Sequence, residues 1–179
     1  MRVISGTAGG RQLKSLPGDA VRPTADHVKE ALFNILQFDL EGRRILDLFG
    51  GTGQLGIEAL SRGAREAVFT DSSRTSVQLI RENLKRCGLE GTVLQTDALS
   101  YLARGEKFDV IFIDPPYDGG LYQAVLERIN AVDNLTEGGI IVCEARAGTE
   151  LPELTPPYRK QRERRYGNVK ICIYSKNEQ

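Results

Sequence analysis

The amino-acid sequence predicts a doubly wound α/β fold with a mostly parallel sheet, and three observations carry this prediction. Short apolar runs alternate with helical patterns between residues 45 and 143, as strands and helices do in such folds. A glycine-rich turn at residues 50–56 lies between the first apolar run and the first helical pattern of this series. After Cys143 the alternation stops, and the last two β-rich segments predict an antiparallel hairpin at the sheet edge.

Length and composition narrow the class of protein. A chain of 179 residues suits one core that needs no disulfide or metal to complete it. The formal net charge is zero, which argues against a protein that binds nucleic acid by bulk electrostatic attraction, so any basic surface must be local. The cysteines Cys87, Cys143 and Cys172 and the single His27 have neither disulfide nor metal-ligand spacing. We therefore expect a reducing compartment and no bound metal.

Location and organisation follow from the same features. No run of 18 apolar residues is present, and the first residues carry no signal-peptide core. These observations favour a cytoplasmic protein without membrane contact, and we expect it to be a monomer. We divide the chain into a basic N-terminal extension, residues 1–23, and a main domain, residues 24–179.

A small N-terminal β-hairpin is expected in the extension. Val3 and Ile4 fit one strand, residues 6–10 fit a glycine-rich turn, and residues 12–16 fit the second strand. Basic residues outnumber acidic ones by four to one here: Arg2, Arg11, Lys14 and Arg22 against Asp19. Such a run either forms a solvated face or contacts RNA, and the sequence leaves both interpretations open.

A helix is predicted from Thr24 to Leu36. Thr24 can cap its first turn, and Asp26 in that turn suits the helix dipole. Apolar residues recur at helical spacing along it: Val28, Ala31, Leu32, Ile35 and Leu36. We therefore expect this helix to pack its apolar stripe on the domain.

The remaining elements alternate along the chain. Strands are expected at residues 45–49, 67–70, 92–96, 108–113 and 140–143, and helices from residue 55 and at residues 73–86, 98–103 and 121–131. The closing hairpin pairs residues 158–166 with residues 169–174. It is the most basic part of the chain, with one acid against six basic residues: Glu163 against Arg159, Lys160, Arg162, Arg164, Arg165 and Lys170. This charge either protects the sheet edge from further pairing or binds nucleic acid.

The glycine turn fits a nucleotide cradle. Gly51, Gly53 and Gly56 match G-x-G-x-x-G, and an apolar strand precedes them while a helical pattern follows. Asp71 stands twenty positions after Gly51, about where an acid would meet ribose hydroxyls. At this level a dinucleotide enzyme fits equally well, and a turn that binds nothing stays possible.

Asp47 helps to distinguish between the possible ligands of the glycine turn. It is a carboxylate inside an otherwise apolar strand. Burying it unpaired would cost several kcal/mol, so it should meet a backbone cap or a cationic ligand. A dinucleotide would place its pyrophosphate near this acid, whereas S-adenosylmethionine carries an ammonium, a sulfonium and a ribose diol. Asp71, Asp97 and Asp114 also follow strand ends and would share one rim of the sheet with Asp47. Four carboxylates on one rim favour a cationic or donor-rich ligand.

The fourth strand runs into Asp114-Pro115-Pro116-Tyr117. Two prolines fix the backbone and donate no N–H, so the carbonyls and the Asp114 carboxylate form a rigid group of acceptors for a planar amine. Accepting both N–H bonds of a nucleobase amine would turn its lone pair toward a methyl donor, and no strong base is needed first. Tyr117 would stack on a base that has left its helix. The alternative is a proline turn without chemistry.

These residues carry a resemblance to a known family. D-P-P-Y looks like the amino-methyltransferase signature of class I S-adenosylmethionine enzymes. Residues 22–36 resemble the R-P-T-x-D-x-V-x-E-x-L-F-N segment of the RsmD family, the 16S ribosomal RNA guanine-N2 methyltransferases. Residues 47–62 are similar to that family's D-x-F-A-G-S-G-x-L-G-x-E-A-L-S-R, with Gly50 and Thr52 in place of Ala and Ser. The likeness extends over nearly the whole chain.

The resemblance implies a class I methyltransferase fold and an enzyme that methylates the exocyclic N2 of one guanine in 16S rRNA of the small ribosomal subunit or its assembly intermediate. It implies a cofactor site for S-adenosylmethionine at Asp47, Phe49, Gly50, Gly51, Gly53, Asp71, Ser72, Asp97 and Ala98. The catalytic group holding the guanine would be Asp114, Pro115, Pro116 and Tyr117. We expect the substrate RNA to contact Arg11, Arg22, Arg162, Arg164 and Arg165.

Three other functions stay open on these residues. An adenine-N6 methyltransferase acting on DNA or RNA also uses D-P-P-Y, although no inserted target-recognition segment is visible. A nicotinamide-dependent oxidoreductase is disfavoured by Asp47 and by the lack of a proton relay other than His27. A non-catalytic RNA-binding assembly factor would use the two basic hairpins alone.

Overall fold

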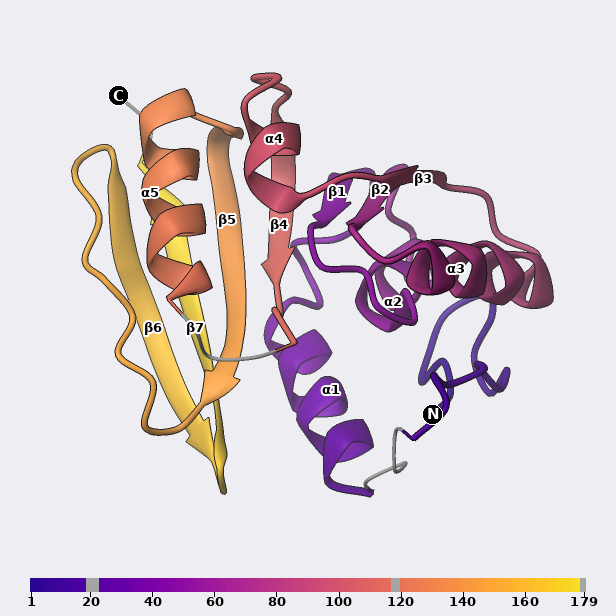
Figure 1. Ribbon diagram of the computed structural model, residues 1–179. Helices are drawn as coiled ribbons and strands as arrows, with labels where there is room; N and C mark the ends of the chain where they lie inside the picture. Colours follow the sequence, from indigo (N-terminus) through magenta and orange to yellow (C-terminus); the bar gives the residue numbers. More distant parts are fainter. Residues whose placement is uncertain (19–22, 117–119, 178–179) are drawn as a thin grey trace.

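The computed structural model describes residues 1–18, 23–116 and 120–177 (Figure 1). Helices and strands alternate along these residues around one sheet. The helices are α1 (Pro23–Ile35), α2 (Gln54–Ser61), α3 (Arg74–Cys87), α4 (Ala98–Leu102) and α5 (Leu121–Val132). The strands are β1 (Arg44–Asp47), β2 (Glu66–Asp71), β3 (Thr92–Gln95), β4 (Phe108–Ile113), β5 (Leu135–Arg146), β6 (Tyr158–Tyr166) and β7 (Val169–Lys176).

The sheet has seven strands in the described residues, in the order β3-β2-β1-β4-β5-β7-β6. Strands β1 to β5 pair in parallel, and β7 pairs antiparallel with both β5 and β6. This confirms the doubly wound, mostly parallel sheet with an antiparallel C-terminal hairpin. The prediction of a strand limited to residues 140–143 was too short. β5 continues to Arg146 because β7 pairs with it as far as the Arg146–Val169 register.

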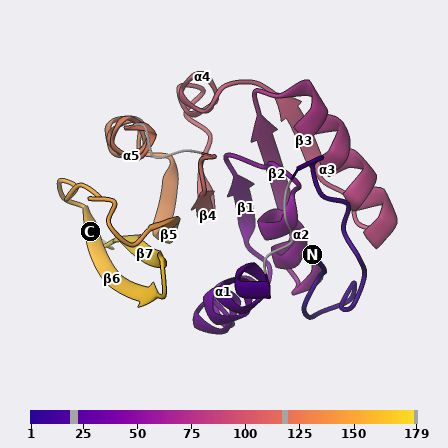
Figure 2. The ribbon, with the colours of Figure 1, turned by 60° about the horizontal axis from the view of Figure 1, so that its bottom comes forward.

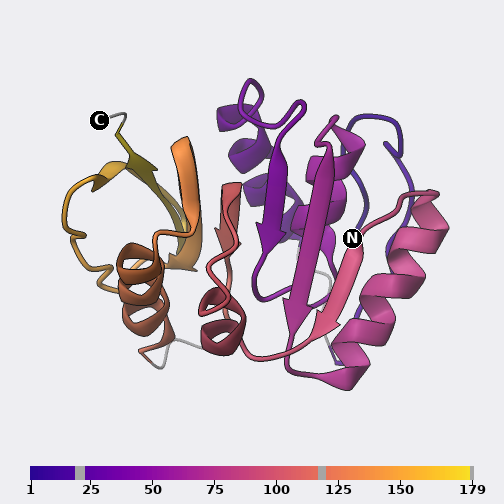
Figure 3. The ribbon, with the colours of Figure 1, turned by 90° about the horizontal axis from the view of Figure 1, so that it is seen from above.

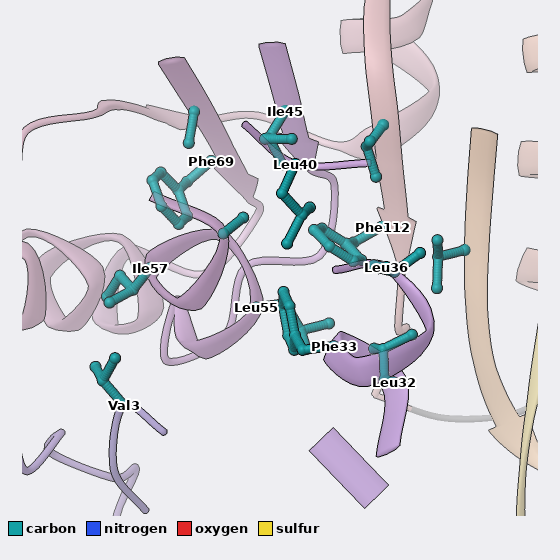
Figure 4. Close-up of a cluster of buried hydrophobic side chains, with 14 of the residues drawn as sticks. Val3, Leu32, Phe33, Leu36, Leu40, Ile45, Leu55, Ile57, Phe69 and Phe112 are labelled. Carbon is teal, nitrogen blue, oxygen red and sulfur yellow. The ribbon is translucent and has the colours of Figure 1, made fainter. Parts of the chain in front are cut away.

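Apolar side chains fill both faces of the sheet. One cluster joins α1, α2 and α3 to the sheet, and a second joins α4 and α5 to the opposite face. Figure 2 shows α1 and α2 on one side of the sheet and α4 and α5 on the other. In the first cluster the rings of Phe33 in α1 and Phe112 in β4 lie 5.8 Å apart between centroids, and Leu55 of α2 lies beside them (Figure 4). Of the predicted apolar stripe of the first helix, Val28, Leu32 and Leu36 are buried, and Ala31 and Ile35 are partly exposed.

The N-terminal segment forms the predicted hairpin only over its central residues. One antiparallel bridge joins Arg2 and Gln12, and on either side of it the Val3 N–H donates to the Arg11 carbonyl at 2.9 Å and the Leu13 N–H donates to the Met1 carbonyl at 3.1 Å. Two further backbone N–H groups of the segment donate to a side chain of α2: Ile4 N to Glu58 Oε2 at 2.8 Å and Ser5 N to Glu58 Oε1 at 3.0 Å. Gly6 lies so close to α2 that a Cβ there would sit 1.8 Å from the Ser61 carbonyl oxygen. The segment therefore pairs with itself over a few residues and is also bound to the main body.

The basic hairpin of β6 and β7 forms one edge of the sheet, and the N-terminal segment lies at the other end of the molecule, beside α2 and α3 (Figures 1 and 2). Along β6 only Tyr158 is buried, so its arginines are solvated.

No helix among the described residues has both the length and the apolar composition that a bilayer crossing requires.

Candidate active site

The acidic rim predicted from the sequence is present. The arrowheads of β1, β2 and β3 point the same way in Figure 3, so their carboxyl ends share one edge of the sheet. Asp47 ends β1, Asp71 ends β2, Asp114 follows β4, and Asp97 follows β3. A parallel sheet brings these side chains together although they are far apart in the chain.

The turn between β1 and α2 needs its glycines for two different reasons. Gly51 and Gly53 have φ values of +58° and +81°, a left-handed conformation that a Cβ disfavours. Gly56 is needed for close packing, since a Cβ there would lie 2.3 Å from the ring of Phe69 on β2. The Gly51 N–H donates to Asp71 Oδ2 at 2.9 Å, which joins the turn to the neighbouring strand. The cradle is therefore held by both glycine geometry and a carboxylate.

Asp47 is buried, with 2% of its surface exposed. Its Oδ2 accepts a hydrogen bond from the Gly56 N–H at 3.0 Å, so the backbone cap considered from the sequence is present. Burial raises the pKa of Asp47 to about 7; the Gly56 hydrogen bond opposes this, and the charge of Asp71 adds to it. One backbone donor leaves this carboxyl poorly compensated, and a cationic ligand beside it would favour its charged form.

A cavity of about 530 Å³ opens in front of the turn. Most of the predicted cofactor and catalytic residues line it: Asp47, Phe49, Gly50, Gly51, Asp71, Ser72, Asp114, Pro115 and Pro116. The N-terminal segment also lines it through Met1 and Leu16, which were not predicted from the sequence. No local motif marks these two side chains, because only the docking of the segment on α2 brings them to the cavity. A cavity of this size and mixed lining is typical of small-molecule sites.

Three predicted cofactor residues do not line this cavity. Gly53 caps the N-terminus of α2, behind the turn. Asp97 is exposed and its Oδ1 accepts the Ser100 N–H at 3.0 Å, which caps α4. A hydrogen bond with the Ser100 side chain and this backbone bond lower the pKa of Asp97. Ala98 is buried in the apolar cluster beneath α4. Their roles toward a ligand stay predictions.

Asp71 links two elements at the cavity. Its Oδ2 accepts from the Gly51 N–H, and its Oδ1 accepts from the Ser73 N–H at 2.8 Å, just before α3. Each oxygen has one N–H donor, which leaves acceptor capacity on the carboxylate. Such a group can accept hydrogen bonds from vicinal hydroxyls without moving.

Asp114 stands between this cavity and a smaller one. Burial raises its pKa well above the ordinary carboxyl range, and the nearby charges of Glu144 and Asp47 raise it further. A cavity of about 160 Å³ on the far side shares Asp114, Pro115 and Pro116 with the first and includes Glu144 of β5. Sequence reasoning missed Glu144, although it is an acid near the carboxyl end of a strand, the signal that identified the other rim acids. Tyr117 lies outside the described residues.

The predicted RNA-contact residues are dispersed. Arg11 is exposed and its Nη1 donates to the Arg86 carbonyl at 2.7 Å, near the end of α3. Arg162, Arg164 and Arg165 are exposed on β6 at the opposite edge of the sheet. Arg22 lies outside the described residues. The basic surface is therefore divided between the two ends of the molecule.

A further feature of the described residues is the arrangement of the possible metal ligands and the cysteines. Within residues 1–18, 23–116 and 120–177, no group of three or more His, Cys, Asp or Glu side chains is arranged to hold a metal ion. The three cysteines are buried as free thiols.

Comparison with known proteins gives a consistent result. The family model described as Conserved hypothetical protein 95 matches residues 1–175. The chain is 41% identical over 182 residues to YlbH of Bacillus subtilis, covering 98% of this chain and 99% of that protein. It is 32% identical to ribosomal RNA small subunit methyltransferase D of Escherichia coli, covering 100% of this chain and 91% of that protein.

Solved structures agree with the sheet topology. The structure of yhhF from Escherichia coli superposes with a TM-score of 0.88 and 30% identity, over 100% of this chain and 99% of that one. The T. thermophilus 16S rRNA N2 methyltransferase RsmC, solved with AdoMet and guanosine, superposes with a TM-score of 0.73 over 91% of this chain and 45% of that one. At 23% identity this second likeness shows the fold alone. The predicted class I methyltransferase fold is confirmed, and the chain belongs to the RsmD family, whose model carries the description Conserved hypothetical protein 95.

Proposed function

We propose that this protein transfers a methyl group from S-adenosylmethionine to the exocyclic N2 of a guanine in 16S rRNA of the small ribosomal subunit. The observation that carries the proposal is the cavity of about 530 Å³, which is lined by Asp47, Asp71 and the glycine turn and also by Asp114, Pro115 and Pro116. Relatives named ribosomal RNA small subunit methyltransferase D support the choice of an rRNA substrate.

The carboxylates that line the cavity match the cationic and hydrogen-bond-donating groups of the cofactor. The poorly compensated Asp47 suits an ammonium, and the spare acceptor capacity of Asp71 suits a ribose diol. Phe49, Gly50 and Ser72 complete the wall between them. Bound there, S-adenosylmethionine supplies an electrophilic methyl group. A dinucleotide fits less well, because its pyrophosphate would lie against two carboxylates.

The chain's own residues then orient the acceptor. Asp114 and the carbonyl oxygen of Pro115 accept hydrogen bonds from the guanine amine and direct its lone pair toward the cofactor cavity. The same hydrogen bonds stabilise the positive charge that develops on the nitrogen during transfer. Deprotonation before attack is unnecessary, because the amine nitrogen loses its proton only after the methyl group has left the sulfonium, and the Asp114 carboxylate beside it can accept that proton. The site therefore needs no histidine or lysine base. Stacking by Tyr117 remains part of the proposal.

Two assays test this function against its rivals. Thermal-shift titration should show stabilisation by S-adenosylmethionine and none by NAD, which separates the methyltransferase from an oxidoreductase. Incubation with small ribosomal subunits that lack the modification should transfer labelled methyl into 16S rRNA. A protein that binds the subunit without transferring label would be an assembly factor instead.

Replacing Asp71 with Ala should weaken S-adenosylmethionine binding by about 1.5 to 3 kcal/mol, because a charge-assisted pair to the ribose is removed. Isothermal titration calorimetry measures the change. Asp71→Asn keeps an acceptor oxygen without the charge and should give an intermediate affinity. Wild-type affinity in the Ala variant would remove Asp71 from the ligand site.

Replacing Arg162, Arg164 and Arg165 together with Ala should weaken binding to the small ribosomal subunit and flatten its salt dependence. Each arginine that no longer neutralises a phosphate reduces the slope of log affinity against log salt by roughly 0.7 to 0.9. Filter binding at several salt concentrations measures the slope, and unchanged S-adenosylmethionine affinity confirms that the variant is folded. If the slope stays at its wild-type value, these arginines protect the sheet edge and do not contact RNA.

A further inference from the structure

The smaller cavity lies directly beside the proposed methyl-transfer position. Its volume is about 160 Å³, and Asp114, Pro115 and Pro116 line both it and the cofactor cavity. Glu144 of β5 and Tyr122 of α5 form its far wall. A group bound in this cavity would therefore touch the same Asp114 that faces the cofactor.

Sheet register places Glu144 next to Asp114. Ile113 of β4 and Cys143 of β5 are paired residues on neighbouring parallel strands, so Asp114 and Glu144 each follow a paired residue, on backbones about 4.8 Å apart. The hydroxyl of Tyr122 donates to the backbone carbonyl oxygen of Glu144, which fixes this part of β5. The position of Glu144 is therefore set by rigid elements and not by a loop.

The Glu144 residue is partly buried and lines this cavity. Within the described part of the chain, no hydrogen bond or ion pair to its carboxylate oxygens is present, and burial raises its pKa. The pKa of Asp114 rises for the same reason and through the Glu144 charge. Two neighbouring acids in this state need hydrogen-bond donors, since two unpaired charges so close together repel each other.

The Watson–Crick edge of guanine supplies two adjacent donors, the ring N1–H and the exocyclic amine. Adenine also carries an exocyclic amine, but its neighbouring N1 has a lone pair and no hydrogen. A second carboxylate beside the amine acceptor therefore suits guanine and opposes adenine. Reading a flipped base through its Watson–Crick edge is a general mode of recognition.

We propose that Glu144 is a specificity-determining residue that accepts a hydrogen bond from N1–H of the target guanine while Asp114 accepts one from its amine. The proposal rests on the proposed function and extends it, because it explains how the site selects guanine over adenine. It also assigns the small cavity to the base and the large one to the cofactor.

Nucleoside binding tests this assignment without requiring methyl transfer. The probes are guanosine and 2-aminopurine riboside, which keeps the 2-amino group but has no N1–H. Saturation-transfer NMR competition on the full chain with S-adenosylhomocysteine measures both affinities. Wild type should prefer guanosine by about 10- to 100-fold, the usual value of one hydrogen bond to a charged group. Glu144→Ala should lose most of this preference through weaker guanosine binding.

Two further variants control the comparison. Glu144→Gln retains an acceptor oxygen at nearly the same shape and should keep part of the preference, which a merely structural role would not explain. Glu137→Gln changes an exposed acid on the same strand and should match wild type. Equal binding of both nucleosides by wild type, no guanosine binding, or full preference in Glu144→Ala would each overturn the proposal. If Glu144→Ala keeps its preference while wild type methylates guanine in subunits, only the role of Glu144 fails and the proposed function stands.

Discussion

Replacing Asp114 with Ala should lower methyl transfer to small ribosomal subunits by about two to three orders of magnitude, with S-adenosylmethionine affinity nearly unchanged. The carboxylate is a preorganised acceptor at the junction of the two cavities, and its hydrogen bond to the amine strengthens as charge develops in the transition state. The cofactor keeps its interactions at the glycine turn, so its binding should survive. Single-turnover transfer of labelled methyl, with calorimetry of cofactor binding, separates the two effects.

Two variants serve as controls for Asp114→Ala: Asp114→Asn and Glu137→Ala. Asp114→Asn keeps an acceptor oxygen but loses the charge, so its rate should fall between wild type and Ala. Glu137→Ala removes an exposed acid away from both cavities and should leave the rate unchanged. Full activity in Asp114→Ala would refute the proposed role of this carboxylate.

Replacing Glu58 with Ala should lower the free energy of unfolding by about 3 to 5 kcal/mol, because one partner of a buried charge network is removed. Glu58 is completely buried, and its oxygens accept from Ile4 N, Ser5 N and, at 2.8 Å, from Arg62 Nε. Lys29, 2% exposed, lies 3.8 Å away and would lose its counter-charge. Urea unfolding followed by circular dichroism measures the decrease.

The same variant should also weaken cofactor binding, because Glu58 holds the segment that carries Met1 and Leu16 to the cavity. The control is Glu82→Ala, which removes an exposed acid paired with Lys14 at the surface and should change stability little. A decrease in Glu58→Ala no larger than that in Glu82→Ala would mean that Glu58 is not what holds the N-terminal segment on the main body.

The fold and the acidic rim could be predicted because their signals are local. Each strand is an apolar run followed by a polar residue, and a parallel sheet must gather these strand ends at one edge. The glycine turn was predicted for the same reason, since left-handed Gly51 and Gly53 leave a visible pattern in the sequence. Whether Asp97 and Ala98 reach the ligand depends on loop geometry, which the pattern does not encode.

The remaining features depend on interactions between distant segments. Glu58 is a polar residue on an otherwise well-buried helix, and its backbone partners lie 53 and 54 residues earlier in the chain. The predicted N-terminal hairpin pairs only around the Arg2–Gln12 bridge, because the N–H groups of Ile4 and Ser5 donate to Glu58 of α2 and not to a second strand. Glu144 was missed because the apolar run of β5 continues through Ala145, so no turn or glycine marks the strand end.

If the site methylates the N2 of a guanine, as proposed, the methyl group must appear in one defined nucleoside of the product. Small ribosomal subunits lacking the modification are incubated with the protein and S-adenosylmethionine carrying a labelled methyl group, and the 16S rRNA is digested to nucleosides. We expect label in N2-methylguanosine and in no other nucleoside. Label in N6-methyladenosine, or in any product other than N2-methylguanosine, would contradict the proposal.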